Sequence, residues 1–447
     1  MGVKTRKLGN ANNQIVQWQA VHVADGSTAL TTVAGRGYFI DTTSGAQTIN
    51  LPATPRFGDK ISFKDFARKW DTNNITIASN KFDGVSSQTA TFNTQGQTIS
   101  LIYMGSAQGW SLINEDTTTG LGKQYVAATG GTVSETGNFK IHTFTGDGNF
   151  VVSAAGNSAG SNTVDYLVVA GGGAGQTKNT RSPNPGRYGQ GGGGGGGLRA
   201  SSGAASGCYT AGPLAACVAA LPVSAQTYPI TVGAGASSPA VPQACATAGG
   251  GSNSTFSTIT SAGGGGGGYG SCAPLKTNGG NGGTGGGGGA GGGGTSGGTG
   301  NTPPVSPPQG ANGGPGTSTA CTAAGAGGGA TGAGTAGAAQ PSPRTSVGGT
   351  GGVGMTSHIT GSPVAYSGGG GGGAGYPGGG GGSVTAGGAS PCGTGGAGGG
   401  PSPSNGGAGT ANRGGGGGGA GGDGSSGTCT GGAGGKGIVI LRYKFQN

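Results

Sequence analysis

Residues that could carry out acid–base or metal chemistry are scarce in this chain and widely spaced. The histidines are His22, His142 and His358, which lie far apart in sequence. Glycosidases place two carboxylates across one substrate bond, and the sequence after residue 120 has few acids for such a pair. Acids of the earlier part mostly adjoin turn sequences, so we expect no enzyme and no cofactor. The later acids are Glu135, Asp147, Asp165 and Asp423.

One stretch resembles a nucleotide-binding loop. Residues 430–437 read TGGAGGKG, but Thr430 stands where the phosphate-binding loop has its first glycine. Gly437 stands where a serine or threonine would bind magnesium, and the sequence that follows is strand-like, whereas the motif requires a helix. We therefore reject a nucleotide site.

The cysteines all lie after residue 200, and none forms a Cys-x-x-Cys pair. With so few histidines, a zinc site is not expected. Disulfides that pin loops are favoured instead, because this region cannot build an ordinary core. Cys208–Cys217 closes the shortest loop and is the first pairing to test; an odd number leaves at least one thiol free or intermolecular. The seven are Cys208, Cys217, Cys245, Cys272, Cys321, Cys392 and Cys429.

The part of the chain that holds these cysteines is dominated by glycine. Of the 119 glycines, 99 lie after residue 170, together with 20 of the 22 prolines. Such a composition is typical of disorder, because fixing each backbone residue costs roughly 1–2 kcal/mol and glycine has no side chain to bury. Collagen is excluded, because glycine occurs in uninterrupted runs. The runs span residues 191–197, 263–268, 285–289, 368–373 and 414–419.

An ordered alternative exists for these runs. A polyproline-II-like helix has about three residues per turn and no internal hydrogen bonds, so its N–H and C=O groups point outward to neighbouring helices. Only glycine lets such backbones approach closely. Each hydrogen bond contributes about 0.5–1.5 kcal/mol, so the packing must be collective. We favour ordered polyglycine packing over disorder.

Strand-like sequences frame the glycine runs. Residues 164–170 lead directly into the first glycines, and residues 437–445 close the region with Leu441 and Tyr443 on one face. Residues 139–144 and 149–152 flank the sequence TGDG, which predicts a β-hairpin. Short strands are expected at 226–232 and 254–260. Together they predict a β-sheet base in a glycine-rich domain spanning residues 139–447.

The earlier part of the chain has an ordinary composition and all three tryptophans. Alternating segments predict a small all-β domain at residues 14–114, large enough for its own core. A polar arm (1–13), read as either an attachment segment or a frayed end, precedes it. A linker (115–138) follows, for which one short strand around 125–126 is left open. The predicted fold is all-β with almost no α-helix. Strands are expected at 38–40, 48–51, 60–64, 74–77, 98–103 and 110–113.

Two regions resemble bacteriophage tail fibre proteins. Residues 30–114, with YFIDTTSGAQTINLPATPRFGDKISFKDF, NNITI and SLIYMGSAQGWSLIN, resemble small β-domains of these fibres. Residues 139–447, with DYLVVAGGGAG, TYPITVGAGA, STFSTITSAGGGGGG and GIVILRYKF, resemble the glycine-rich domain of phage fibres and fibre-tip adhesins. The resemblance implies a virion protein, a homotrimer that attaches to other tail proteins through its N-terminal region and recognises the host distally.

Non-glycine insertions between the runs are the expected recognition elements, because loops held on a scaffold carry specificity. Aromatic rings stack on sugars and arginine donates to hydroxyls or phosphates, so the expected partner is host polysaccharide, lipopolysaccharide or an outer-membrane protein. The alternative, that tyrosine and proline merely cap the glycine helices, remains open. The candidates are Arg181, Arg187, Tyr188, Tyr209, Tyr269, His358, Tyr366 and Tyr376.

Charge and hydropathy restrict the other partners. The net charge is +10, yet lysine and arginine are spread thinly and form no cluster with aromatics, so nucleic acid binding is not expected. No apolar run approaches ~18–20 residues, so membrane insertion is not expected either. Residues 1–13 lack the apolar core of a signal peptide, which indicates synthesis in the host cytoplasm and a virion location, extracellular after release. A structural fibre or spacer of the neck, collar or capsid surface, without receptor binding, is the alternative function.

Overall fold

A computed structural model shows an all-β protein, as the sequence predicts, with 1% of residues helical. The chain divides into two compact units. The first contains residues 1–127 with 154–162 and 445–447, and the second contains 128–153 and 163–444. The structure describes residues 16–113, 124–158, 160–178, 187–206, 212–215, 218–240, 246–271, 276–291, 293–318, 323–341, 344–376, 388–400, 404–422 and 427–446.

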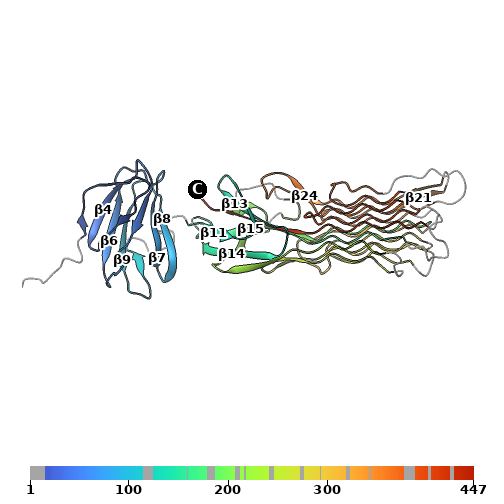
Figure 1. Cartoon of the computed structure of the whole chain (residues 1–447), viewed down its shortest axis with the longest axis horizontal. Helices are drawn as coiled ribbons and strands as arrows, with labels where there is room; N and C mark the ends of the chain where they lie inside the picture. Colours follow the sequence, from blue (N-terminus) through green and yellow to red (C-terminus); the bar gives the residue numbers. More distant parts are fainter. Residues whose placement is uncertain are drawn as a thin grey trace, which may run out of the picture. The chain divides into compact units, whose positions relative to one another are not determined.

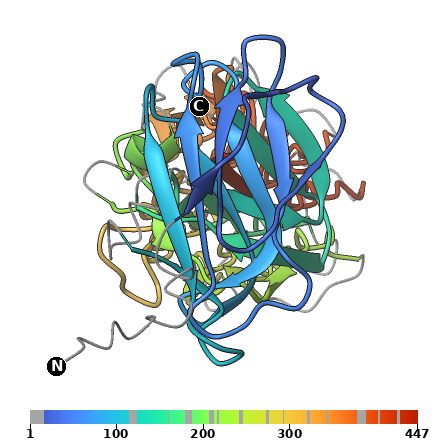
Figure 2. The same ribbon diagram turned by 90° about the vertical axis from the view of Figure 1, so that its left-hand side faces the viewer.

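The first unit contains a ten-stranded mixed sheet, whose strands lie side by side in Figure 2 (blue to cyan). The order along the sheet is β1-β4-β6-β9-β10-β7-β5-β3, with β2 on β4 and β8 on β7. The strands are β1 (Gln17–Trp18), β2 (His22–Val23), β3 (Leu30–Thr31), β4 (Arg36–Asp41), β5 (Gln47–Asn50), β6 (Lys60–Asp65), β7 (Ile75–Phe82), β8 (Val85–Phe92), β9 (Thr98–Tyr103) and β10 (Trp110–Leu112).

The core of this unit consists of apolar side chains that alternate along the strands. Ile61 and Phe63 on β6, with Ile75 and Ile77 on β7, are fully buried, as period-two patterning requires. They pack in one cluster with Trp70, which is also fully buried. The predicted strands are therefore present in this unit, and β1, β2, β3 and β8 are strands that the sequence did not predict.

The second unit begins with two sheets. A six-stranded sheet has the order β12-β13-β25-β15-β16, with β17 on β15, and a five-stranded sheet has the order β11-β14-β18-β19-β20. Strands β11 and β12 fall within the stretch expected to be a linker. The strands are β11 (Val126–Thr129), β12 (Thr132–Thr136), β13 (Phe139–Phe144), β14 (Gly148–Ala155), β15 (Thr163–Val169), β16 (Leu198–Ala200), β17 (Leu221–Pro222), β18 (Thr227–Thr231), β19 (Ser254–Phe256), β20 (Ile259–Ser261) and β25 (Ile438–Lys444).

Strand β25, the last of the described chain, lies antiparallel between β13 and β15. It therefore ties residues on both sides of the glycine region into one sheet. Its Tyr443 joins an aromatic cluster with His142, Phe150 and Phe256 that links strands of the two sheets. The expected sheet base is thus present, with the first and last strands of the glycine-rich region adjacent.

The hairpin predicted at TGDG is wrong. Strands β13 and β14, which flank it, belong to different sheets. β13 pairs with β12 and β25, while β14 pairs with β18. Asp147 does not close a turn but accepts a hydrogen bond from the backbone N–H of Val232 (2.8 Å). The segment is a corner between sheets, because the C-terminal strand takes the edge that β14 would have used.

Beyond the sheets of the second unit, the glycine runs extend side by side as a bundle of segments (Figure 1). Two short hairpins mark the ends of this bundle. β23 (Met355–Ser357) and β24 (Val364–Tyr366) lie near the sheets, and β21 (Ala338–Pro341) and β22 (Arg344–Val347) lie at the opposite end (Figure 1). We call this bundle the glycine lattice and the end away from the sheets its far end.

Candidate functional site

The glycine lattice is held by backbone hydrogen bonds with a period of three residues. In the central segment 189–197, Gly191, Gly194 and Gly197 donate to carbonyls of segment 262–271, at 2.8–3.0 Å. The acceptors Gly268, Gly265 and Ala262 descend in number, so the two segments are antiparallel. A three-residue repeat is the turn of a polyproline-II helix. The ordered packing expected from the sequence is therefore present.

Each face of the central segment bonds to a different neighbour. Gly193 donates to Gly417, and Gly192 donates to Gly325. Carbonyls of the same segment accept from three further neighbours, for example Gly193 from the N–H of Gly370. The central segment is thus surrounded on all sides, as in a hexagonal array. Its neighbours are segments 171–178, 262–271, 284–291, 323–330, 367–376 and 414–422.

The glycine positions inside the lattice have no room for a side chain. A Cβ placed on Gly193 would lie 2.2 Å from the carbonyl oxygen of Gly173, and one on Gly371 would lie 1.9 Å from that of Gly388. Both distances are far inside van der Waals contact, and the obstacle is backbone. Gly249, at the surface, does have room for a side chain. A Cβ placed there would have the Cβ of Ala236, at 3.7 Å, as its nearest neighbour.

The outer helices carry side chains at every third residue. Asn278 and Asn281 are exposed in this spacing, as are Ser296 and Thr299 on the next helix. The side-chain oxygens of Asn278 and Asn281 accept the backbone N–H groups of Ser296 (3.0 Å) and Thr299 (2.8 Å). The same side-chain-to-backbone contact recurs from Thr430 to Asn405 (2.8 Å). We call the exposed residues Asn278, Asn281 and Asn405 the edge caps, since their side-chain oxygens accept backbone N–H groups at the surface of the lattice.

The far end of the lattice is closed by a buried glutamine. The amide nitrogen of Gln190 donates to the carbonyls of Tyr188 (2.9 Å) and Gly270 (3.2 Å), and its oxygen accepts the N–H of Gly270 (3.0 Å). Gln190 is 2% exposed. It satisfies backbone groups where two glycine segments end, which would otherwise be buried without partners.

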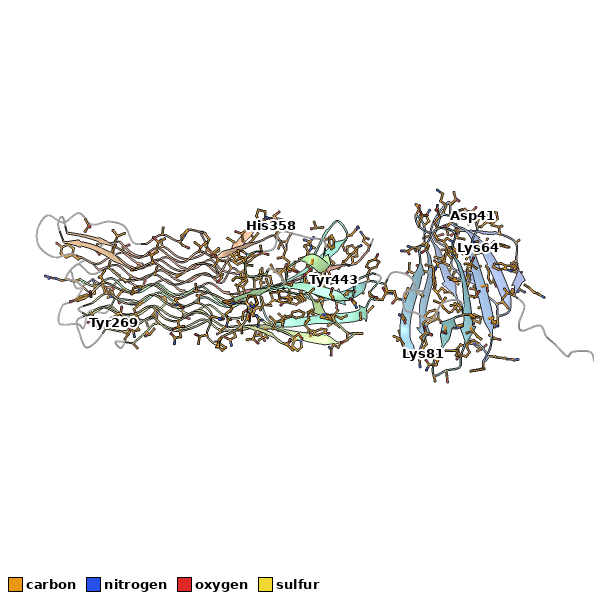
Figure 3. The ribbon with its side chains drawn as sticks, turned by 180° about the vertical axis from the view of Figure 1, so that it is seen from behind. Asp41, Lys64, Lys81, Tyr269, His358 and Tyr443 are labelled. Carbon is orange, nitrogen blue, oxygen red and sulfur yellow. The ribbon has the colours of Figure 1, made fainter. Side chains whose placement is uncertain are left out.

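Four of the eight predicted recognition residues gather around this glutamine. Arg187 and Tyr188 precede it, and Tyr269 precedes the glycine that it clamps. Tyr376 joins them through its N–H, which donates to the carbonyl of Arg187 (2.9 Å). Figure 3 shows Tyr269 at the far end of the lattice. Arg187 is exposed and Tyr376 is 36% exposed. Tyr269, at 2% exposure, is buried in the lattice and its ring is not available for stacking.

Two other predicted residues lie near the sheets. His358 follows β23 at the sheet end of the lattice (Figure 3). Tyr366 on β24 is 2% exposed, and the Arg413 guanidinium lies 5.2 Å from its ring centre. Burial raises the pKa of Tyr366 to about 12, so this side chain is a core residue. The eight residues therefore do not form one surface.

The remaining predictions lie outside the described residues. These are Arg181, Tyr209 and the Cys208–Cys217 disulfide. Of the cysteines in the described part, Cys429 is buried and Cys392 is a half-buried free thiol within 3.1 Å of the Thr394 hydroxyl.

Sequence reasoning missed the glutamine clamp and the edge caps. A glutamine inside a glycine run, as in GQGGGGGGG at residues 189–197, was a usable signal, because a lone amide there must bond to backbone. The edge caps had a signal as well. Asn278 and Asn281 are spaced by three residues, the period of the helix on which they lie.

The comparison with protein families agrees with this architecture. A family model described as a glycine-rich domain matches residues 143–444. The chain therefore belongs to the glycine-rich domain family. A search of curated proteins found no match to this chain. In the part of the chain that the structure describes, no helix is long and apolar enough to span a membrane.

Proposed function

We propose that this protein is a phage tail fibre or fibre-tip adhesin that binds the host cell surface with the far end of its glycine lattice. The observation that carries the proposal is the convergence of Arg187, Tyr188 and Tyr376 around the Gln190 clamp. An arginine and tyrosines on one rigid end can donate to and stack against a surface glycan. In this proposal the first unit attaches to other virion proteins.

The lattice supports the proposal through its rigidity. Because each glycine segment bonds to its neighbours once per turn, the ends of the segments are fixed relative to one another. Recognition groups on such a scaffold lose little conformational entropy on binding. The trimeric state and the virion location rest on the resemblance to tail fibres and belong to the same proposal.

A structural spacer is the second candidate, and it has its own supporting observation. Tyr269 and Tyr366 are buried within the second unit, where they stabilise the lattice and its sheet base. If Arg187, Tyr188 and Tyr376 serve only to close the lattice, the protein is a stiff fibre of the neck, collar or capsid surface.

Adsorption competition separates the two candidates. Purified full-length protein, added to host cells before phage, is expected to block adsorption if it is the adhesin. Arg187→Gln and Tyr376→Ala should each weaken the block by roughly tenfold, the scale of one charged hydrogen bond or stacked ring. The matched controls are Arg36→Gln, an exposed arginine on β4, and Val353→Ala, an exposed residue on the side of the lattice.

The outcomes are distinct. Failure of the wild-type protein to compete at saturating concentration would sink the adhesin and leave the spacer. A block that the two controls weaken as strongly as the two far-end variants would place binding elsewhere on the chain.

A further inference from the structure

A pocket of about 230 Å³ lies in the first unit, far from the glycine lattice in sequence. Pockets for drug-sized ligands measure about 300–1,000 Å³, so this one suits a smaller ligand. Its apolar lining includes Pro52, Pro55 and Tyr103, and its polar lining includes Asn80, Lys81 and Ser106. Trp110 forms part of the lining but is 2% exposed, so it supports the pocket without offering a ring face.

The charge of the lining is one-sided. Among the described residues that line the pocket, Lys81 is the only charged one. Its ammonium donates one hydrogen bond to the carbonyl of Ser106 (3.1 Å) and has two further N–H groups. The Tyr103 hydroxyl is a further donor in the lining. The pocket therefore offers several donors and no negative charge.

The walls of the pocket are fixed by backbone contacts. The turn between β9 and β10 is closed by hydrogen bonds from Gly109 to Gly105 (2.7 Å) and from Met104 to Gly109 (2.8 Å). Gly109 has a φ of 75°, and a Cβ there would lie 2.1 Å from the carbonyl oxygen of Lys81. This glycine lets the chain just before β10 pass against the Lys81 backbone, and so it fixes the backbone of Lys81, which lines the pocket together with Tyr103.

A sugar ring fits these features better than a peptide. A pyranose has an apolar face of C–H groups that packs on an aromatic ring, with hydroxyls at its edge that accept from amide and ammonium donors. A peptide strand would need an open sheet edge, but β10 is already paired with both β9 and β7. The single positive charge selects an acidic sugar over a neutral one.

We propose that this pocket binds an acidic monosaccharide unit, a hexuronate, with its carboxylate on Lys81 and its C–H face against Tyr103. This site is separate from the far end of the lattice and does not depend on the function proposed for it. It gives the first unit a ligand of its own in addition to any attachment role.

The test is titration of the full-length protein with glucuronate and, as the neutral probe, glucose. Trp110 in the lining allows tryptophan fluorescence to follow binding, and calorimetry gives the affinity. Glucuronate is expected to bind about tenfold tighter than glucose, and Lys81→Gln should remove that difference. Tyr103→Leu should weaken both sugars, because it removes the ring.

Lys64→Gln is the matched control. The Lys64 ammonium also donates to a backbone carbonyl, that of Gly96 (2.6 Å), and Figure 3 places it at the opposite end of the first unit from Lys81. This variant should leave glucuronate binding unchanged. An unaltered melting temperature for Lys81→Gln confirms that the loss is local.

Three results would overturn the proposal: no glucuronate binding at roughly 50 mM, equal affinity for glucose, or an equal loss with Lys64→Gln. The result is independent of host adsorption. A protein that binds glucuronate through Lys81 and fails to block adsorption retains this site and loses the proposed adhesin function.

Discussion

The first unit and the glycine lattice are stabilised in opposite ways. The first unit buries large side chains such as Trp70, Phe63 and Phe82, and its stability comes from apolar area removed from water. The lattice buries backbone, and its stability comes from many hydrogen bonds of about 0.5–1.5 kcal/mol each. The difference reverses the usual effect of mutation. Removing atoms damages the first unit, whereas adding atoms damages the lattice.

The largest expected effect is therefore a side chain added inside the lattice. Gly371→Val puts a branched side chain where even a Cβ would lie 1.9 Å from the Gly388 oxygen. Because backbone on both sides must move, we expect a loss of more than about 4 kcal/mol in the free energy of unfolding. Amide hydrogen exchange of the glycine segments measures this loss. Unchanged protection would show that the segments are loose loops.

Gly249→Ala is the matched control within the lattice. The new methyl group meets only Ala236 at 3.7 Å, so nothing has to move. Replacing glycine also lowers the entropy of the unfolded chain, so a gain of about 0.4–1 kcal/mol is expected. Tryptophan fluorescence reports the first unit alone, because all three tryptophans lie between residues 18 and 110. The unfolding transition followed by tryptophan fluorescence should therefore be the same in Gly249→Ala and in the wild-type protein.

Local sequence predicted the first unit well but predicted hairpins poorly. Two of the Asp-Gly pairs in the sequence show why. Asp83 and Gly84 have φ values of 45° and 86°, as a tight hairpin turn requires, and join β7 to β8. Asp147 and Gly148 carry the same sequence signal and form a corner between sheets. The hairpin predicted at the second pair does not form, because β25, some 290 residues later, occupies the edge of β13. No local sequence pattern can reveal this pairing.

For the lattice, sequence predicted the helix type but not the roles of its side chains. Glycine content and polyproline-II geometry were enough to expect mutual backbone bonding. Which tyrosines face solvent was not accessible, because Tyr269 and Tyr376 both adjoin glycine runs, yet one is buried and the other is partly exposed. The burial of each tyrosine depends on which glycine helices lie beside it, and the arrangement of these helices is set by the whole lattice.

The sheet base of the second unit contains a buried histidine whose charge state depends on pH. His142 is fully buried, its Nδ1 lies 2.7 Å from the Gly130 carbonyl, and its Nε2 lies 3.1 Å from the Tyr443 hydroxyl. A carbonyl only accepts, so Nδ1 carries the proton and Nε2 accepts from Tyr443. Burial lowers the pKa of His142 below its usual 6.5, assisted by the nearby Lys140 charge and opposed by the Gly130 hydrogen bond.

This shift predicts acid sensitivity. Below pH 6.5 the unfolded chain takes up a proton that folded His142 resists, so stability present above that pH is lost as the pH falls towards the folded pKa. The loss is at most about 1.4 kcal/mol per pH unit. His142→Gln should flatten the decline in unfolding free energy between roughly pH 7.5 and 5.5. Equal slopes in wild type and His142→Gln would contradict the assignment.

The smallest expected effect on the free energy of unfolding is at the edge caps. There a side chain, and not another backbone, accepts the N–H groups of the lattice. Asn278→Ala with Asn281→Ala removes the acceptors of the Ser296 and Thr299 N–H groups. Water can replace them at this exposed surface, so the loss in unfolding free energy should be about 1 kcal/mol. The greater consequence is that the Ser296 and Thr299 N–H groups lose their partners within the chain. Like the unpaired N–H groups of an exposed sheet edge, they then favour pairing with another chain.

Light scattering at increasing protein concentration measures that consequence. The double variant is expected to self-associate where the wild-type protein does not change. Asn149→Ala is the control, since Asn149 is an exposed asparagine on β14 that caps no lattice N–H in the described structure. If the double variant and the control scatter alike, the asparagines do not prevent self-association and contribute only to stability.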